Sequence, residues 1–238
     1  MTVFEILGFG DKGWGLALLE GALTTLLVSL AGLGIGSILG SLVAWSKLSG
    51  NPVAGGIGNA YAAIFRGVPE LLVVYFVYFG SSALLTAAGN LAGFTGFIGV
   101  PSFVAGAVAV GIVSGANQAE VYRGAYLAIA RGELEAAKSV GMARWLMFRR
   151  IIVPQVLRFA IPGLGNQWQA ALKVSSLVSV TGLAELMRIS QVAAGSTRQP
   201  FVFYLAGGAL YLLLTTLSDR VFGKAEAYAT RGLRSPQG

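Results

Sequence analysis

Five long apolar stretches restrict what this chain can fold into more than any other feature. They cover residues 16–45, 68–88, 103–122, 159–183 and 201–217. A helix needs about 20 apolar residues to cross a bilayer core, where unpaired backbone groups are too costly to leave. Charged residues make up only 11% of the chain. We therefore predict an all-helical integral membrane protein with five spans, formed as a single domain over residues 1–238.

The positions of the basic residues predict the orientation of the chain, because short cytoplasmic loops carry an excess of lysine and arginine. With the N-terminus outside, the basic residues on the outer side are Lys12, Arg188 and Arg198. Those on the inner side are Lys47, Arg66, Arg123, Arg131, Lys138, Arg144, Arg149, Arg150, Arg158, Arg220, Lys224, Arg231 and Arg234. This asymmetry predicts an external N-terminus and a cytoplasmic C-terminus, and it explains the net charge of +7 without nucleic-acid binding.

The residue types that are missing restrict the chemistry. The chain has no cysteine and no histidine. It therefore has no disulfide framework, no thiolate metal site and no Ser-His-Asp triad. An intramembrane enzyme would have to use a pair such as Ser176 and Lys173, which lie three apart on one predicted helix. We predict no active site, metal or cofactor on this chain.

Small residues recur in the first span. Gly32, Gly36 and Gly40 are four apart on one face, a spacing that lets two helices approach closely. We expect this face to pack within the chain, and a subunit interface is the alternative.

A charged segment, residues 131–154, interrupts the apolar pattern between the third and fourth spans. Its strong helix formers predict a helix over residues 133–150, outside the bilayer. Trp145, Met147 and Phe148 add apolar surface, which a helix wholly in water has no reason to carry. Lipid headgroups or another protein can cover such a surface, and the residues alone leave both possibilities open.

Small side chains line one side of this predicted helix. Ala137 and Gly141 are four apart, and Ala136 lies beside them, so another backbone can approach this side closely. Pro154 then ends or kinks the helix before the fourth span.

This segment matches a known pattern. The pattern EAA-x3-G-x9-I-x-V-P is formed by Glu135, Ala136, Ala137, Gly141, Ile151, Val153 and Pro154. It resembles the EAA loop of ATP-binding-cassette (ABC) importer permeases, with valine where leucine is common. The segments FRGVPELL, AEVYRGAYLAI, NQWQAALKVSSLVSVTGLAELMR and FYLAGGALYLLLTTLSD are similar to the polar amino-acid uptake branch, in particular to Q-type permeases of basic amino-acid and opine systems. The resemblance covers residues 13–231.

The resemblance implies a MetI-like, type I importer domain in a bacterial inner membrane, with a periplasmic N-terminus. The EAA loop would form a cytoplasmic coupling helix that docks on an ATPase subunit. The implied partners are two ATPase subunits that hold ATP and Mg²⁺, a periplasmic solute-binding protein and a second permease. That permease is commonly a different chain, and an identical copy is the alternative.

The implied function is import of polar amino acids, foremost basic ones, or of related opines. A secondary carrier or channel without an ATPase is the alternative. The EAA loop and the lack of inverted halves in five spans count against it.

A polar stripe runs along the fourth span. It consists of Asn166, Gln169, Lys173 and Ser176, at steps of three, four and three along one side of a helix. Such groups must face the protein interior or a water-filled path. One hypothesis is that Lys173 attracts a substrate carboxylate while the others form hydrogen bonds. The structural alternative is that Lys173 pairs with Glu70, Glu120 or an acid of the partner subunit.

Glu120 and Asn117 lie on one side of the third span, and Glu120 precedes Arg123 by three residues. A local ion pair near the cytoplasmic end explains Glu120. The functional alternative is an exit gate, or an acid that meets a cationic substrate side chain.

Overall fold

The computed structural model describes residues 3–10 and 13–229. Lys12, Arg231 and Arg234, which contribute to the predicted orientation, lie outside the described residues, as do the last residues of the predicted domain. The helices in chain order are α1 (Val3–Leu7), α2 (Gly15–Leu48), α3 (Pro52–Gly67), α4 (Glu70–Tyr75), the π-helix η1 (Phe76–Gly80), α5 (Ser81–Leu91), α6 (Ser102–Leu127), α7 (Arg131–Ser139), α8 (Arg144–Met147), the π-helix η2 (Phe148–Ile152), α9 (Val153–Ser175), the 3-10 helix η3 (Ser176–Thr181), α10 (Leu186–Thr197) and α11 (Pro200–Ala229).

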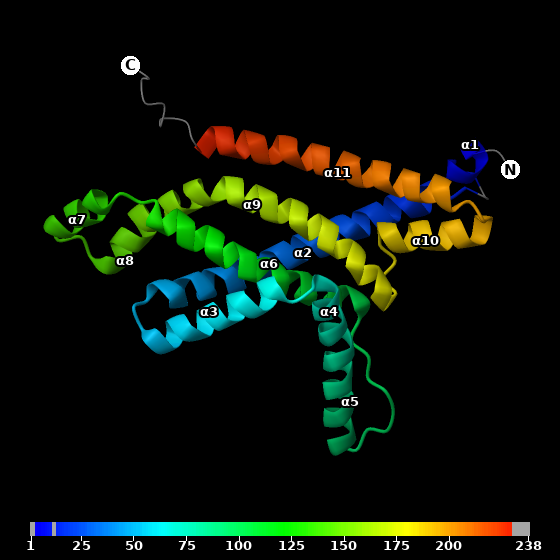
Figure 1. Cartoon of the computed structure of the whole chain (residues 1–238), viewed down its shortest axis with the longest axis horizontal. Coiled ribbons are helices and arrows are strands. Elements are labelled where there is room, and N and C mark those ends of the chain that lie inside the picture. The colour runs from blue at the N-terminus through cyan, green and yellow to red at the C-terminus, as the bar shows by residue number, and fades with distance from the viewer. Residues whose placement is uncertain (1–2, 11–12, 230–238) are drawn as a thin grey trace.

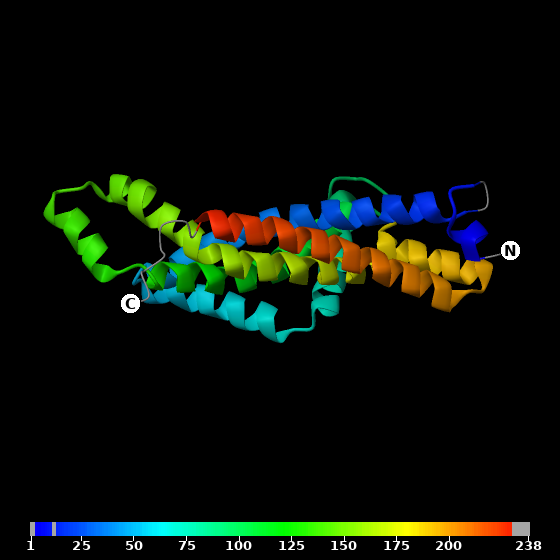
Figure 2. The same ribbon diagram turned by 90° about the horizontal axis from the view of Figure 1, so that it is seen from above.

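The long helices α2, α6, α9 and α11 run along one axis, as both views show (Figures 1 and 2). The helices α7 and α8 project from one end of this bundle, which we call the α7 end. The helices α1 and α10 lie at the opposite end, which we call the α10 end. The helix α5 lies across the bundle axis and extends away from it (Figure 1). The start of α2 and the end of α11 therefore lie at opposite ends of the molecule.

Four of the five predicted spans are confirmed as long apolar helices. Within the described residues, four helical segments are long and apolar enough to cross a membrane, namely Gly15–Leu48, Glu70–Leu91, Ser102–Leu127 and Pro200–Ala229. A fifth span results if Arg144–Thr181 and Leu186–Thr197, which meet at a 51° bend, count as one. The fourth predicted stretch is thus part of a broken helix.

The glycine face of α2 packs on α6 of the same chain, as expected. A Cβ atom at Gly32 would lie 2.5 Å from Cγ1 of Val110, and one at Gly36 would lie 2.7 Å from Nε2 of Gln118. Real Cβ contacts are longer than this, so only glycine allows the two helices to approach so closely.

A buried amide joins the same two helices. The Gln118 amide nitrogen donates to the Leu33 carbonyl at 3.2 Å and to the Ser114 hydroxyl at 2.8 Å. Its carbonyl oxygen accepts from Ser37 at 2.8 Å and from Tyr122 at 3.0 Å. A buried amide is tolerated when it is fully hydrogen-bonded, so this network stabilises the α2–α6 pair.

The helix α3 was not predicted, because its 16 residues are too short and too glycine-rich for a span. It begins at Asn51, whose side chain accepts hydrogen bonds from the backbone N–H groups of Val53 and Ala54. It then packs back along α2 and α6, where the Tyr61 hydroxyl donates to the Ile112 carbonyl at 2.7 Å.

A buried acid organises the break before α10. Gly182 adopts a left-handed conformation with φ of 85°, and Glu185 then caps α10 by accepting from the backbone N–H groups of Met187 and Arg188. The same carboxylate accepts from Thr25 of α2 at 3.2 Å and from Tyr211 of α11 at 3.0 Å. Glu185 thus ties three helices together at full burial.

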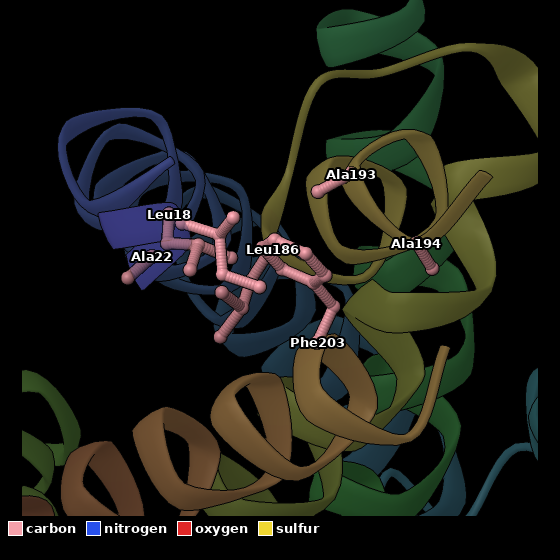
Figure 3. Close-up of a cluster of buried hydrophobic side chains, with 7 residues drawn as sticks. Leu18, Ala22, Leu186, Ala193, Ala194 and Phe203 are labelled. Atoms are coloured by element: carbon pink, nitrogen blue, oxygen red, sulfur yellow. The ribbon is translucent and has the colours of Figure 1, made fainter. Parts of the chain in front are cut away.

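Apolar side chains surround this point and form the core of the α10 end (Figure 3). They are Ile6 of α1, Leu18 and Ala22 of α2, Leu186, Ala193 and Ala194 of α10, and Phe203 of α11.

The charged segment differs from its prediction. Instead of one helix over residues 133–150, the chain forms α7, a turn and α8, which continues through η2 into α9. The reason is the left-handed backbone of Gly141, with φ of 73°, which ends α7 and reverses the chain.

Candidate functional site

The projecting helix α7 carries the first three residues of the EAA pattern. Glu135 and Ala136 are exposed, whereas Ala137 is only 5% exposed and packs within the chain. The Glu133 carboxylate accepts a hydrogen bond from the Gln155 side chain at the start of α9. This hydrogen bond ties α7 to the start of α9. Ala137, one of the small residues on the side that another backbone was expected to approach, is therefore covered by this chain itself.

Gly141 closes α7 through two backbone hydrogen bonds. Its own N–H donates to the Lys138 carbonyl at 3.0 Å, and the N–H of Met142 donates to the Ala137 carbonyl at 3.0 Å. This is a Schellman motif, in which glycine supplies the left-handed residue. A Cβ atom at Gly141 would meet nothing within 4 Å, so the space beside it is open in this chain.

Aromatic residues follow the turn. The rings of Trp145 and Phe148 stack with centroids 5.7 Å apart, and they are 69% and 45% exposed. Val140 is 77% exposed at the end of α7. These residues give the α7 end an apolar surface beside the basic Arg149 and Arg150. Pro154 is the last residue of the EAA pattern and is exposed. It is the second residue of α9, a helix that follows η2 directly.

A polar cavity of about 450 Å³ lies between α4 and α9. Its lining consists of Glu70, Asn166, Gln169, Ala170, Lys173, Val174 and Leu177. Three of the four predicted stripe residues therefore face one cavity, which is large enough for a small ligand. The fourth, Ser176, lies outside this lining, and its hydroxyl donates to the Lys173 carbonyl at 2.6 Å.

A second, smaller cavity adjoins the first. Asn117 and Ser114 of α6 line it together with Gln167, and Glu70 lines both cavities. The Asn117 amide donates to the Val113 carbonyl at 3.3 Å. The packing of α6 on α9 thus brings Asn117 close to residues of the polar stripe.

Glu120 is not part of either lining. Its carboxylate forms ion pairs with Lys47 and with Arg123, the latter at 2.9 Å. The local pair with Arg123 was the structural alternative for Glu120, and the structure adds Lys47 from the end of α2. Glu120 therefore fastens α2 to α6 near the α7 end.

Gln169 has a partner that the sequence did not suggest. Its amide nitrogen donates to the Asp219 carboxylate of α11. This bond orients the amide and leaves its oxygen available to the cavity.

Sequence reasoning missed or undervalued four polar residues, namely Glu70, Asp219, Lys47 and Glu185. Each is an ionisable group near or within an apolar stretch, which is a signal that it needs a partner or a function. The identity of the partner depends on which helices meet, and residue spacing does not show this.

Long apolar helices, a cavity lined by polar residues between them and a charged segment that projects at one end are features of a membrane permease. The model of the family described as "Binding-protein-dependent transport system inner membrane component" matches residues 17–226. The chain belongs to this family.

Similar proteins support this assignment along nearly the whole chain. The octopine transport system permease protein OccQ of Rhizobium radiobacter is 47% identical over 98% of this chain and 99% of its own length. The histidine/lysine/arginine/ornithine transport system permease protein HisQ of Escherichia coli (strain K12) is 37% identical over 88% of this chain and 91% of its own. A crystal structure of an amino acid ABC transporter with histidines matches with a TM-score of 0.76 and 28% identity, over 90% of this chain and 95% of the other. The MetI-like fold predicted for this chain is thus confirmed.

Proposed function

We propose that this chain is a permease subunit of an ATP-driven importer for cationic amino acids or related opines, and that it catalyses no reaction itself. One observation carries the proposal: helix α7, which holds the Glu-Ala-Ala residues of the EAA pattern, projects beyond the spans, while polar residues line a cavity between α4 and α9. The relatives named for octopine transport and for histidine, lysine, arginine and ornithine transport support this substrate class.

The proposed orientation places the α7 end in the cytoplasm and the α10 end in the periplasm of a bacterial inner membrane. The basic residues of the elements that reach the α7 end support it; they include Lys47, Arg123, Arg131, Arg144, Arg150 and Arg220. Arg188 and Arg198 belong to the α10 end. Lysine and arginine collect on the cytoplasmic side of membrane proteins, so the α7 end is available to a cytoplasmic partner.

In this proposal α7 is the coupling helix. It docks on one of two ATPase subunits, which hold ATP and Mg²⁺, through Glu135, Ala136 and the surface beside Gly141. Because α8, η2 and α9 follow one another without a gap, a displacement of α7 and α8 reaches the cavity residues on α9 directly. Such rigid transmission, together with a second permease subunit, would switch the cavity between the two sides of the membrane.

The cavity is the proposed substrate path. Lys173 attracts the carboxylate of the amino acid, and Asn166 and Gln169 supply hydrogen bonds. Asn117 extends the path into the adjoining cavity. A periplasmic solute-binding protein delivers the substrate at the α10 end.

The experiment is uptake of radiolabelled arginine into proteoliposomes that hold this chain with its ATPase, companion permease and solute-binding protein. We expect uptake that requires ATP hydrolysis and falls when Glu135 is changed to Arg, while the solute-binding protein still binds arginine. A Glu20→Arg variant, at the exposed start of α2, is the matched control and should retain uptake. Uptake driven by an ion gradient without the ATPase would show a secondary carrier instead.

A further inference from the structure

Glu70 and Lys173 bring opposite charges to one cavity without forming an ion pair. Glu120, the other acid considered as a partner of Lys173, pairs with Lys47 and Arg123 instead. Within the described part of the chain, neither the Glu70 carboxylate nor the Lys173 ammonium group forms a hydrogen bond. The expected structural pairing of Lys173 with Glu70 or Glu120 is therefore not formed in this chain.

The placement of Glu70 is specific. It is the first residue of α4, at the point where the chain turns from α3 toward the transverse helix α5 (Figure 1). It lines the larger cavity together with Lys173 and Asn166 of α9, and the smaller one together with Asn117 of α6. Both residues are exposed, and both line the larger cavity. An ionisable group among membrane spans needs a partner, and here the open space between the charges can hold one.

We propose that Glu70 selects the cationic group of the substrate while Lys173 holds its carboxylate, so that the amino acid lies across the cavity in one direction. This inference rests on the proposed function and adds a residue that determines charge selectivity. An amino acid with a guanidinium or ammonium side chain carries a carboxylate at one end and a cation at the other. This charge pattern complements Lys173 and Glu70, and the Asn166 and Gln169 amides can contact the chain between them.

The geometry also explains why Glu70, rather than Glu120, fits this role. The Glu120 carboxylate already pairs with Lys47 and Arg123, so its charge is neutralised within the chain. Gln169 is oriented by Asp219, which leaves its amide oxygen as an acceptor for a substrate N–H group. Glu70 is thus the one acidic residue that lines the cavity among the described residues.

Two ligands of nearly equal shape test the inference. Arginine carries a guanidinium group, whereas citrulline carries a neutral urea group at the same position. Equilibrium dialysis of the detergent-solubilised complex of this chain with its companion permease and ATPase, without the solute-binding protein, gives the dissociation constant of each. We expect wild type to prefer arginine, and Glu70→Gln to weaken arginine binding about tenfold while citrulline binding stays the same, since a lost charge-assisted hydrogen bond costs about this much.

Two further variants complete the test. Glu20→Gln removes an acid outside the cavity and should keep the wild-type preference, and Glu70→Asp keeps the charge and should retain most of it. Lys173→Met should reduce the preference for arginine over agmatine, which lacks the carboxylate. If Glu70→Gln disrupts the complex, the Glu70→Asp variant is measured instead. A retained preference for arginine over citrulline then supports the selective role of Glu70, and a lost preference overturns it.

The inference is wrong if wild type does not distinguish arginine from citrulline, or if Glu70→Gln weakens both ligands equally. The second result would show that Glu70 serves packing or pairs with the partner subunit. These failures are distinct from failure of the proposed function, which would appear as loss of ATP-dependent uptake by the wild-type complex.

Discussion

Substitutions of Gly141 separate the backbone role of this residue from contact with another subunit. The left-handed conformation costs an ordinary residue roughly 1–2 kcal/mol, about 5- to 30-fold in the population of the capped turn. Gly141→Ala bears this cost and no other, because its Cβ atom would meet nothing within 4 Å. The buried Ala137 and the hydrogen bond between Glu133 and Gln155 also hold α7, so this range is an upper limit. Gly141→Asn should cost less, because asparagine tolerates the left-handed region.

Gly141→Arg adds volume to a position that is open within this chain. Any loss beyond that of Gly141→Ala must therefore come from a neighbouring subunit. We expect a further loss of about tenfold in substrate-stimulated ATP hydrolysis, because extra bulk in a packed interface typically costs 1–3 kcal/mol. Gly223→Arg places the same side chain in open space on α11 and serves as the control.

The assay is ATP hydrolysis by the reconstituted importer with saturating substrate-loaded binding protein. We expect the rate of ATP hydrolysis to fall from wild type to Gly141→Asn, then to Gly141→Ala and then to Gly141→Arg. The Gly223→Arg control should equal wild type. Equal rates for the Ala and Arg variants would refute contact of the Gly141 surface with the ATPase.

Three further predictions concern packing and pairing. Gly32→Ala should lower the melting temperature of the purified complex through a clash that costs about 1–3 kcal/mol. Gly34→Ala is the control and should not lower it, because a Cβ atom there would meet open space. Equal melting temperatures for the two variants would contradict the close packing of α2 on α6. Lys47→Met should strongly lower the melting temperature of the complex, because it leaves the Glu120 carboxylate without this partner. Adding Glu120→Gln to the same chain should restore part of the lost melting temperature, and a double-mutant cycle measures the coupling between the two residues. Tyr211→Phe removes one donor to the buried carboxylate at the start of α10 and should cost about 1–3 kcal/mol in thermal unfolding; no change would mean that this hydrogen bond contributes nothing.

Most of the fold could be predicted from the sequence, because span length and apolar composition depend on the bilayer rather than on tertiary contacts. The spacing of Gly32 and Gly36 also predicted a close helix contact, since a helix places residues four apart on one face. The helix α3 could not be found in this way, because its stability comes from packing on α2 and α6. The break of the fourth span depends on the left-handed Gly182, and apolar content alone does not show it.

The candidate site was predicted in part. The period of the stripe placed Asn166, Gln169 and Lys173 on one side of α9, and the cavity is on that side. Ser176 does not share the lining because α9 changes to the 3-10 helix η3 at this residue, which alters the helical period. Glu70 was named only as an ion-pair partner of Lys173, because its place in the cavity depends on the tertiary fold rather than on residue spacing.

The most direct test of the proposed coupling uses the absence of cysteine from this chain. A single cysteine at the exposed Ala136 of α7, treated with a short bifunctional reagent in the assembled complex, should form a covalent adduct with the ATPase subunit. A cysteine at Leu84, which is 73% exposed on α5 and distant from α7 (Figure 1), should form none. Failure of the Ala136→Cys variant to react with the ATPase in an intact complex, or equal reaction from Leu84→Cys, would contradict the assignment of α7 as the coupling helix.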